Sequence, residues 1–469
     1  MMQFETIIGI EIHLELNTKT KMFSGALIDF NADPNTKVTP IDIAYPGTLP
    51  LLNKEAVVSG IKLAKALKME IDHLLRFDRK NYFYPDLPKG FQITQQFHPI
   101  GKNGALKINV NGKEHLVEIE RIHLEEDTAR QHHYEEDTFI DYNRAGIPLI
   151  EIVTRPVIHS ADVAAKYVET IRQIALSQNI SDARMEQGSL RADVNLSLRP
   201  LGSQLFGTKV EIKNINTISN IKKAIENEIA IQTKKLLGNI KIEQETKRFD
   251  EATQTNISMR KKTGAIDYKY FREPNIPSIK LENKFVDGIK LAELPWEKED
   301  RYRKHNINDI YLTRLLNDYK LADFFDGIEY NDLDKKSKIL FNEFVAYANS
   351  VNKHVTEIGI NQEKIKECLE FIDKGVISGK QLKTLVPLLV NASKTVFDLI
   401  KENDLMQLSD EKELTKIIDS IITPELKIQY KENPERVIRQ ISGQLMKITK
   451  AKANPVVSNK IIIGRLSDD

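Results

Sequence analysis

The chain has 469 residues, a formal net charge of +1, and 41% hydrophobic and 29% charged residues. This balance is typical of folded globular proteins and predicts two to four domains of about 100–200 residues. It excludes a strongly basic surface over the whole molecule, so any contact with nucleic acid must be local.

The single cysteine, Cys368, excludes intrachain disulfides and a cysteine-rich zinc site, and it fits a reducing cytoplasm. The N-terminal residues lack the pattern of a secretory signal, and no apolar stretch approaches the ~18 residues of a membrane helix. We therefore expect a cytoplasmic protein without a membrane span.

The first half of the sequence is a mixture of predicted strands and helices. The predicted strands are Ile7–Leu16, Leu106–Val110, Val117–Leu124, Leu149–Thr154, Leu190–Leu198 and Lys209–Lys213. Helical spacing of apolar residues predicts helices over Asn53–Lys68 and over Ser160–Gln178, with Ser160 as N-cap. Because strands outnumber helices and do not alternate regularly with them, we expect an α+β fold with a largely antiparallel sheet.

After Leu294 the sequence becomes rich in lysine and helical in period. A further junction is predicted over Asn391–Asp410, followed by a helical and locally basic tail. The predicted domains are therefore a catalytic domain over 1–294, a helical domain over 295–405 and a helical tail domain over 406–469.

Two predicted strands carry polar residues on one face and aliphatic residues on the other. Successive strand residues point to opposite faces, so this pattern predicts a sheet with one face in a core. The polar faces carry Glu11, His13 and Glu15 in the first strand, and Arg191, Asp193, Asn195 and Ser197 in the second. Carboxylates gathered on one surface commonly hold a cation or perform acid–base chemistry, which favours an enzyme.

Further acidic residues follow or interrupt other strands. Glu125, Glu126 and Asp127 form a row that could equally be an ordinary charged surface. Glu151 lies within an aliphatic run, so its carboxylate needs a partner, a metal or a raised pKa. A structural salt bridge to Arg144 or Arg155 is the alternative.

Lys209, Glu211 and Lys213 share one face of a strand, where they could simply neutralise one another. If the acidic segments converge, oxygen ligands with one imidazole suit Mg²⁺ or Mn²⁺. The candidate ligands are Glu11, His13, Glu125, Glu126, Glu151, Asp193 and Glu211. Cationic side chains could then face nucleotide phosphates, namely Arg191, Lys209, Lys213 and Arg260.

The loop Asn81–Gln92 places three consecutive aromatic residues next to two prolines. It could fill the core, or it could form a wall that faces a substrate. No Walker A motif is present, so ATP would require a different scaffold.

Collinear segments of the chain resemble the B subunit of the tRNA-dependent amidotransferases that make Gln-tRNA or Asn-tRNA from mischarged Glu-tRNA or Asp-tRNA. The segments are IGIEIHLEL, TKTKMFSG, YPGTLPLLN, KNYFYPDLPKGFQ, RIHLEEDTAR, DYNRAGIPLIEIV, MEQGSLRADVNLSLRP, GTKVEIKNIN, SMRKKTGAIDYKYFREPNIP and GQLMKITKAKANP. The resemblance implies a cradle-shaped catalytic domain, a helical domain, and a helical tail that contacts tRNA.

The resemblance also implies a division of labour in a heterotrimer. This subunit would use ATP and Mg²⁺, with a second divalent cation, to phosphorylate the carboxylate of the tRNA-borne Glu or Asp. A partner amidase (A) subunit would supply ammonia from glutamine, and a small C subunit would join the other two.

The resemblance further implies roles for particular residues. Its metal ligands fall on the seven candidates named above, and the catalytic residues would be Glu125, Glu151 and His13. The substrate wall or ammonia path would include Lys80, Tyr82, Tyr84 and Lys89, and the tRNA contacts would include Lys447, Lys450 and Lys452.

The sequence departs from the family pattern at two places. Residues 39–44 lack the cysteines that many relatives carry before YPGTLPLLN, and the tail between Asn433 and Gly443 is shorter than usual. Two other functions stay open: a non-catalytic tRNA-binding scaffold for an amidase, and an unrelated metal-dependent hydrolase. The scaffold gives no reason for acids on several strand faces, and the hydrolase gives none for the basic tail.

Overall fold

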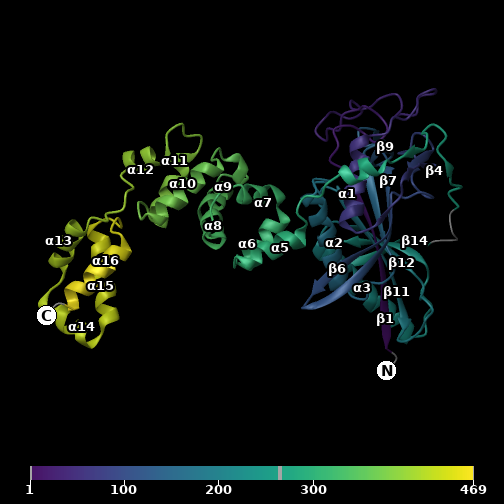
Figure 1. Cartoon of the computed structure of the whole chain (residues 1–469). Helices are drawn as coiled ribbons and strands as arrows, with labels where there is room; N and C mark the ends of the chain where they lie inside the picture. The colour runs from purple at the N-terminus through teal and green to yellow at the C-terminus, as the bar shows by residue number, and fades with distance from the viewer. Residues whose placement is uncertain (1–2, 262–266, 468–469) are drawn as a thin grey trace. The chain divides into compact units, whose positions relative to one another are not determined.

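The computed structural model describes residues 3–261 and 267–467 of the chain, in two compact units (Figure 1). The first unit is Met1–Glu297 and contains all the strands that the structure describes; the second is Lys298–Asp469 and is helical. The first predicted boundary, after residue 294, lies close to this division.

A nine-stranded sheet forms the centre of the first unit, in the order β14-β13-β12-β11-β1-β10-β7-β6-β2. Neighbouring strands run antiparallel among the described residues, except for the parallel pair β12 and β13. The strands are β1 (Phe4–Glu15), β2 (Glu70–Ile71), β6 (Gly101–Val110), β7 (Lys113–Glu126), β10 (Pro148–Thr154), β11 (Leu190–Pro200), β12 (Val210–Ile215), β13 (Glu245–Asp250) and β14 (Thr255–Lys261).

Period-2 patterning explains how the sheet is oriented. Ile8, Ile10 and Ile12 of β1 are fully buried, and their neighbours Glu11 and His13 lie on the opposite face. The apolar face packs against three helices, α1 (Lys54–Ala66), α2 (Ala161–Ser177) and α3 (Ile218–Leu237). One face of the sheet is therefore core, and the other is left for polar side chains.

The two predicted helices of this unit are present, and both begin at a side-chain cap. Asn53 caps α1, and Ser160 caps α2 by accepting a hydrogen bond from the Val163 amide. The 20-residue helix α3 was not predicted.

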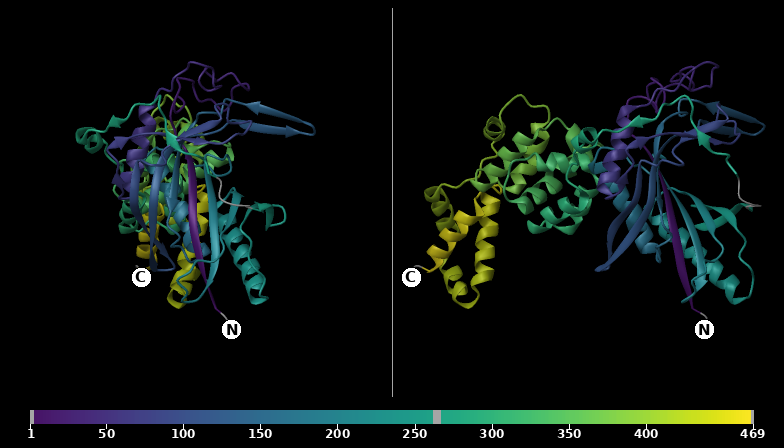
Figure 2. Two further views of the ribbon diagram at one scale, coloured as in Figure 1. Left: turned by 90° about the vertical axis from the view of Figure 1, so that its right-hand side faces the viewer. Right: turned by 45° about the vertical axis from the view of Figure 1, so that its right-hand side comes forward.

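Smaller sheets accompany the large one. They comprise a three-stranded sheet of β15 (Phe271–Arg272), β4 (Asp78–Asn81) and β5 (Phe91–Thr94), a pair of β3 (Leu74–Leu75) with β16 (Ile279–Lys280), and a hairpin of β8 (Arg130–Tyr134) with β9 (Asp137–Asp141). The β8–β9 hairpin projects from the rest of the unit (Figure 2).

The second unit consists of short helices around two separate hydrophobic clusters, one within 302–400 and one within 414–466. Its helices include α5 (Pro295–Lys304, which begins in the first unit), α10 (Gln362–Asp373), α11 (Gly379–Leu389), α12 (Val396–Glu402), α13 (Glu411–Ile421), α14 (Pro424–Glu432), α15 (Pro434–Ile448) and α16 (Pro455–Ser467). Cys368 is buried in the first cluster. The helix α12 occupies the middle of the segment that was predicted to be a junction.

The predicted fold class is thus confirmed: an α+β part with a mostly antiparallel sheet precedes a helical part. The division into three domains stays a prediction. Across the described residues, no helix is both long enough and apolar enough to span a bilayer.

Candidate functional site

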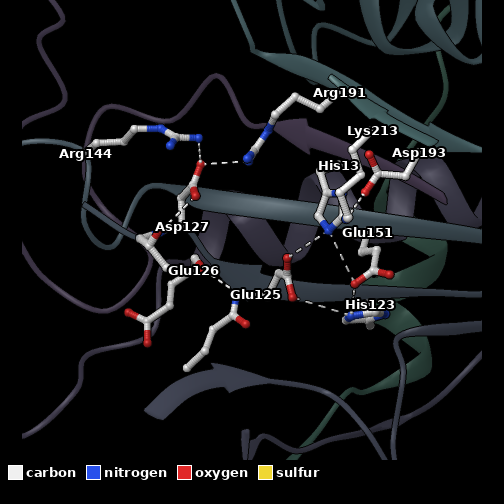
Figure 3. A network of polar contacts seen from close by, with 12 residues as sticks. His13, His123, Glu125, Glu126, Asp127, Arg144, Glu151, Arg191, Asp193 and Lys213 are labelled. Atoms are coloured by element: carbon white, nitrogen blue, oxygen red, sulfur yellow. Dashed lines mark hydrogen bonds and ion pairs between the residues drawn. The ribbon is translucent and has the colours of Figure 1, made fainter. Parts of the chain in front are cut away.

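The polar face of the sheet brings four side chains into one row across four strands. Glu151 of β10 lies opposite both His13 of β1 and His123 of β7, and His13 lies opposite Arg191 of β11. Side chains directly opposite one another on neighbouring strands are within contact distance. The register of the sheet therefore assembles this site from segments far apart in the sequence (Figure 3).

The first acidic group comprises His13, Glu125 and Glu151, whose potential ligand atoms all lie within 4.8 Å of one another. Nε2 of His13 is 3.7 Å from Oε1 of Glu125 and 3.6 Å from Oε2 of Glu151. Burial opposes ionisation of Glu151, but His123 and His13 hold its pKa well below the ordinary value. Glu151 is therefore an ionised, largely buried carboxylate.

His123 lies in the site but is absent from the residues predicted from the sequence. Its Nε2 lies 3.1 Å from Oε2 of Glu151 and 3.6 Å from Oε2 of Glu125. Burial opposes a charge on the ring, yet the two carboxylates raise its pKa to about 9. Lys80 adds a further cation, because the charges of Glu125 and Glu151 raise its pKa despite its burial.

The second acidic group comprises Glu11, Asp193 and Glu211 from three neighbouring strands. Burial, and then the like charges of Glu151, Asp193 and Glu211, raise the pKa of Glu11. Nζ of Lys213 lies 2.6 Å from Asp193 and 3.2 Å from Glu211, and these carboxylates raise its pKa against the effect of burial. The two groups together hold carboxylates whose mutual repulsion a bound cation would relieve.

Asp127 joins two arginines at the end of the row. Its carboxylate accepts hydrogen bonds from Arg144 and, at 2.9 Å, from Arg191 (Figure 3). Arg144 also lies 3.4 Å from Glu15. Burial and, after it, the charge of Asp127 raise the pKa of Glu15 to about 7. This network fixes the guanidinium of Arg191 beside His13.

Two cavities open beside the acidic groups. One, of about 560 Å³, is lined by His13, Arg191, Asp193 and Lys213 together with residues 185–188 and 214–216. The other, of about 260 Å³, is lined by Glu11 and Lys209 together with a more apolar wall that includes Ile7, Gly9, Pro156, Leu196 and Phe206. His13 and Asp193 thus line a cavity with both cationic and acidic side chains, and Glu11 lines a mainly apolar one.

Comparison with known proteins identifies the family. The family described as "GatB/GatE catalytic domain" matches residues 6–287, and that described as "GatB domain" matches residues 323–466. Proteins named as the B subunit of aspartyl/glutamyl-tRNA(Asn/Gln) amidotransferase are 58% identical in Mycoplasmopsis agalactiae and 55% identical in Mycoplasmopsis synoviae, each over 100% of this chain and 99% of the relative. The chain belongs to this family of amidotransferase B subunits. The resemblance and the enzyme class inferred from the sequence are thereby confirmed.

Two of the metal-ligand and phosphate-binding residues predicted for this B subunit are not among the described residues of the acidic groups and cavities. Glu126 points away from His13 (Figure 3). It pairs with Lys89, whose Nζ lies 2.6 Å from Oε2 of Glu126. It belongs to neither acidic group. The side chain of Arg260 lies outside the described part of the chain.

Two alternative interpretations are wrong. Glu151 contacts histidines, whereas Arg144 pairs with Glu15 and Asp127, and Arg155 pairs with Glu118. The consecutive aromatic residues of the Asn81–Gln92 loop do not fill the core, because Phe83 is 89% exposed and Tyr84 is 57% exposed, although Phe91 packs against it. Tyr82 is partly buried against Tyr268, near the Lys80 ammonium group.

The three predicted tRNA-binding lysines differ in their surroundings. Lys447 and Lys450 are exposed at the end of α15. Lys452 forms an ion pair with Asp404 within the same unit. The structure thus leaves Lys447 and Lys450 as the more accessible of the three.

Proposed function

We propose that this chain uses ATP and Mg²⁺ to phosphorylate the side-chain carboxylate of Glu or Asp on mischarged Glu-tRNA(Gln) or Asp-tRNA(Asn). Ammonia supplied by a partner glutaminase subunit then converts the activated residue into Gln or Asn. The observation that carries this proposal is the pair of adjacent acidic groups on one sheet face, the first beside Lys80 and the second beside Lys213.

The side chains present fit divalent cations. The first group offers an imidazole and two carboxylates, and the second offers three carboxylates. Burial, and after it the like charges of Glu151, Asp193 and Glu211, raise the pKa of Glu11, and a cation would relieve this repulsion. Mg²⁺ held by these residues would neutralise charge on the transferring phosphoryl group.

The linings of the two cavities suit the two substrates, ATP and the mischarged tRNA. The cavity beside Glu11 has apolar walls suited to a nucleotide base, with Lys209 at its rim for a phosphate. The larger cavity presents Arg191 and Lys213, which suit the acceptor carboxylate at the end of the mischarged tRNA. Donor and acceptor would then approach the acidic groups from different sides.

The proposed reaction has two steps, phosphoryl transfer and then amide formation. An oxygen of the acceptor carboxylate attacks the γ-phosphorus, the bond to the β-phosphate oxygen breaks, and ADP leaves. Ammonia then attacks the acyl carbon, phosphate leaves with the transferred carboxylate oxygen, and the nitrogen loses a proton. Arg191, held by Asp127, and Lys213 would orient the anionic acceptor throughout.

Partner subunits would complete the enzyme. The apolar side chains exposed around the N-terminal loops support docking of an amidase (A) subunit, with a small C subunit completing a heterotrimer. They are Leu27, Phe30, Tyr45, Leu49, Leu51, Phe83 and Tyr84. Lys80 and Tyr82 interact with Glu125 of the first acidic group, and Tyr82 also packs against Tyr84 of this loop region. These contacts, with the Lys89–Glu126 ion pair, support the assignment of these residues to the substrate wall or ammonia path.

The helical tail would hold the tRNA through phosphate contacts. The exposed Lys447 and Lys450 support this role, whereas Lys452 is already paired with Asp404. The use of tRNA and ATP, with one buried cysteine, supports action in the cytoplasm.

ADP release by the assembled complex, measured with and without mischarged tRNA, tests this function. We expect release that depends on the mischarged tRNA. No ADP release would favour a tRNA-binding scaffold, and hydrolysis of another substrate that needs metal but not ATP would favour a hydrolase. Measuring amidation of Glu-tRNA(Gln) and Asp-tRNA(Asn) separately would identify which of them the complex uses.

A further inference from the structure

His123 occupies an enclosed position at one end of the row of polar side chains. It comes from β7 and lies directly opposite Glu151 of β10, and only 6% of its side chain is exposed. Its alternation with Ile122 and Leu124, both fully buried on the core face, points the imidazole toward the polar face.

The imidazole touches both carboxylates of the first acidic group from the side away from Arg191. Nε2 of His123 lies near Oε2 of Glu125, while Nε2 of His13 lies near Oε1 of the same carboxylate. On Glu151, both imidazoles approach Oε2, at 3.1 Å for His123 and 3.6 Å for His13. Glu125 and Glu151 are thus each placed between two rings (Figure 3).

The other ring nitrogen of His123, Nδ1, does not tie the imidazole to another group of the described residues. Nδ1 is buried and has no hydrogen-bond partner among the described residues. The polar contacts of this ring therefore go to Glu125 and Glu151, through Nε2.

We infer that His123 is a positioning residue that holds the Glu125 and Glu151 carboxylates in the arrangement needed to bind a divalent cation with His13. Groups behind metal ligands commonly fix the ligands' orientation, and their loss weakens metal affinity about 10–100-fold. The inference rests on the proposed metal site. His123 itself stays behind the ligands and contacts no substrate.

Binding of Mn²⁺ to the purified complex, followed by electron paramagnetic resonance, tests this inference without relying on activity. His123→Leu removes the ring nitrogens and keeps apolar bulk, and we expect a roughly 10–100-fold weaker Mn²⁺ affinity at one site. The site formed by Glu11, Asp193 and Glu211 should keep its affinity. The matched control is His115→Leu, because His115 lies on the same strand and pairs with Ile108, away from the acidic groups.

A second pair of variants keeps the test decisive if His123→Leu does not fold. The amide of His123→Gln can reach the position of Nε2, whereas the shorter amide of His123→Asn cannot. We expect Gln to restore most of the Mn²⁺ affinity and Asn to restore little. In activity assays, the weaker variant should need more metal for half-maximal ADP formation while its KM for mischarged tRNA stays unchanged.

Wild-type Mn²⁺ affinity in His123→Leu or in His123→Asn would overturn the inference. A wild-type complex that binds no Mn²⁺ would instead contradict the proposed metal-dependent function on which the inference rests. The two failures are therefore distinguishable by the wild-type measurement alone.

Discussion

Glu151 contacts both histidines in or beside the first acidic group. Its carboxylate contacts His13 and His123, which come from the strands on either side of β10. We predict that Glu151→Gln lowers tRNA-dependent ADP formation at least about 10²-fold, because a neutral amide loses the charge that holds a cation. Steady-state ADP formation by the purified complex measures the effect, and Glu125→Gln should behave alike.

The control for this prediction is Glu118→Gln. Glu118 lies on β7, as Glu125 does, but it is half exposed and pairs with Arg155. Its replacement should leave ADP formation within about twofold of wild type, because surface ion pairs contribute little. Thermal unfolding should be similar in all three variants, and a wild-type rate in Glu151→Gln would remove Glu151 from the catalytic site.

Single residues of the site were predictable where strand alternation was unbroken. Glu11, His13 and Asp193 were placed on one face by period 2 alone, and the structure brings them to the same surface. His123 carries the same signal, since it alternates with Ile122 and Leu124, but the acidic row that follows is the stronger feature of this segment. Glu126 differs in its surroundings, because β7 ends there and its side chain turns to Lys89, and its role as a ligand stays a prediction.

At the scale of elements, the segment between β11 and β12 forms one wall of the cavity beside Glu11. Gly207 in this segment approaches β11 closely, and a Cβ added there would lie 2.0 Å from the carbonyl oxygen of Leu198. We predict that Gly207→Ala displaces the wall and raises the KM for ATP at least about tenfold, because a shift of about 1 Å in positioning groups can cost 10²-fold.

Initial-rate measurements with varied ATP would test this wall. Gln204→Ala is the matched control, because Gln204 is exposed in the same segment and does not line the cavity. The KM for mischarged tRNA should change little in either variant. An unchanged KM for ATP in Gly207→Ala would show that this cavity does not bind the nucleotide.

Helices of the first unit were predictable only where their buried face is apolar. In α2 the stripe includes Val163, Tyr167 and Ile171, and its period is clear. In α3 the buried face includes Asn220, Glu228 and Gln232, so polar residues interrupt the pattern. Glu228 is buried because Lys247 of β13 pairs with it at 2.9 Å, a long-range contact that local periodicity cannot reveal.

On the scale of the whole molecule, the glutaminase activity should belong to a partner. The sole cysteine is buried, and burial raises its pKa, so it is unsuited to act as a nucleophile. We predict that the isolated chain releases no ammonia from glutamine, whereas the complex amidates mischarged tRNA with exogenous ammonium. Ammonia release by the chain alone would overturn the division of labour.

The tail should contribute tRNA affinity that depends on salt. Removing residues from about Leu408 onward should raise the KM for mischarged tRNA and leave the partner's glutaminase activity nearly unchanged. The tail has its own hydrophobic cluster, which supports removing it as a piece. Each lost phosphate contact should reduce the log–log salt slope by roughly 0.7–0.9.

A milder variant controls for the deletion. Lys447→Gln combined with Lys450→Gln removes two exposed charges and retains the Lys452–Asp404 ion pair. Binding assays at two salt concentrations should give a smaller slope for this variant than for wild type. Equal affinities and equal slopes for all three proteins would assign the tail another purpose.

The transfer of oxygen from the substrate carboxylate to phosphate tests the central claim most directly. Mischarged tRNA would carry ¹⁸O in both side-chain carboxylate oxygens of its Glu or Asp, and the complex would be supplied with unlabelled ATP and glutamine. Phosphorylation of the carboxylate predicts that each amide formed is accompanied by one phosphate containing one ¹⁸O atom, detectable by mass spectrometry. Amide formation with unlabelled phosphate would contradict the account.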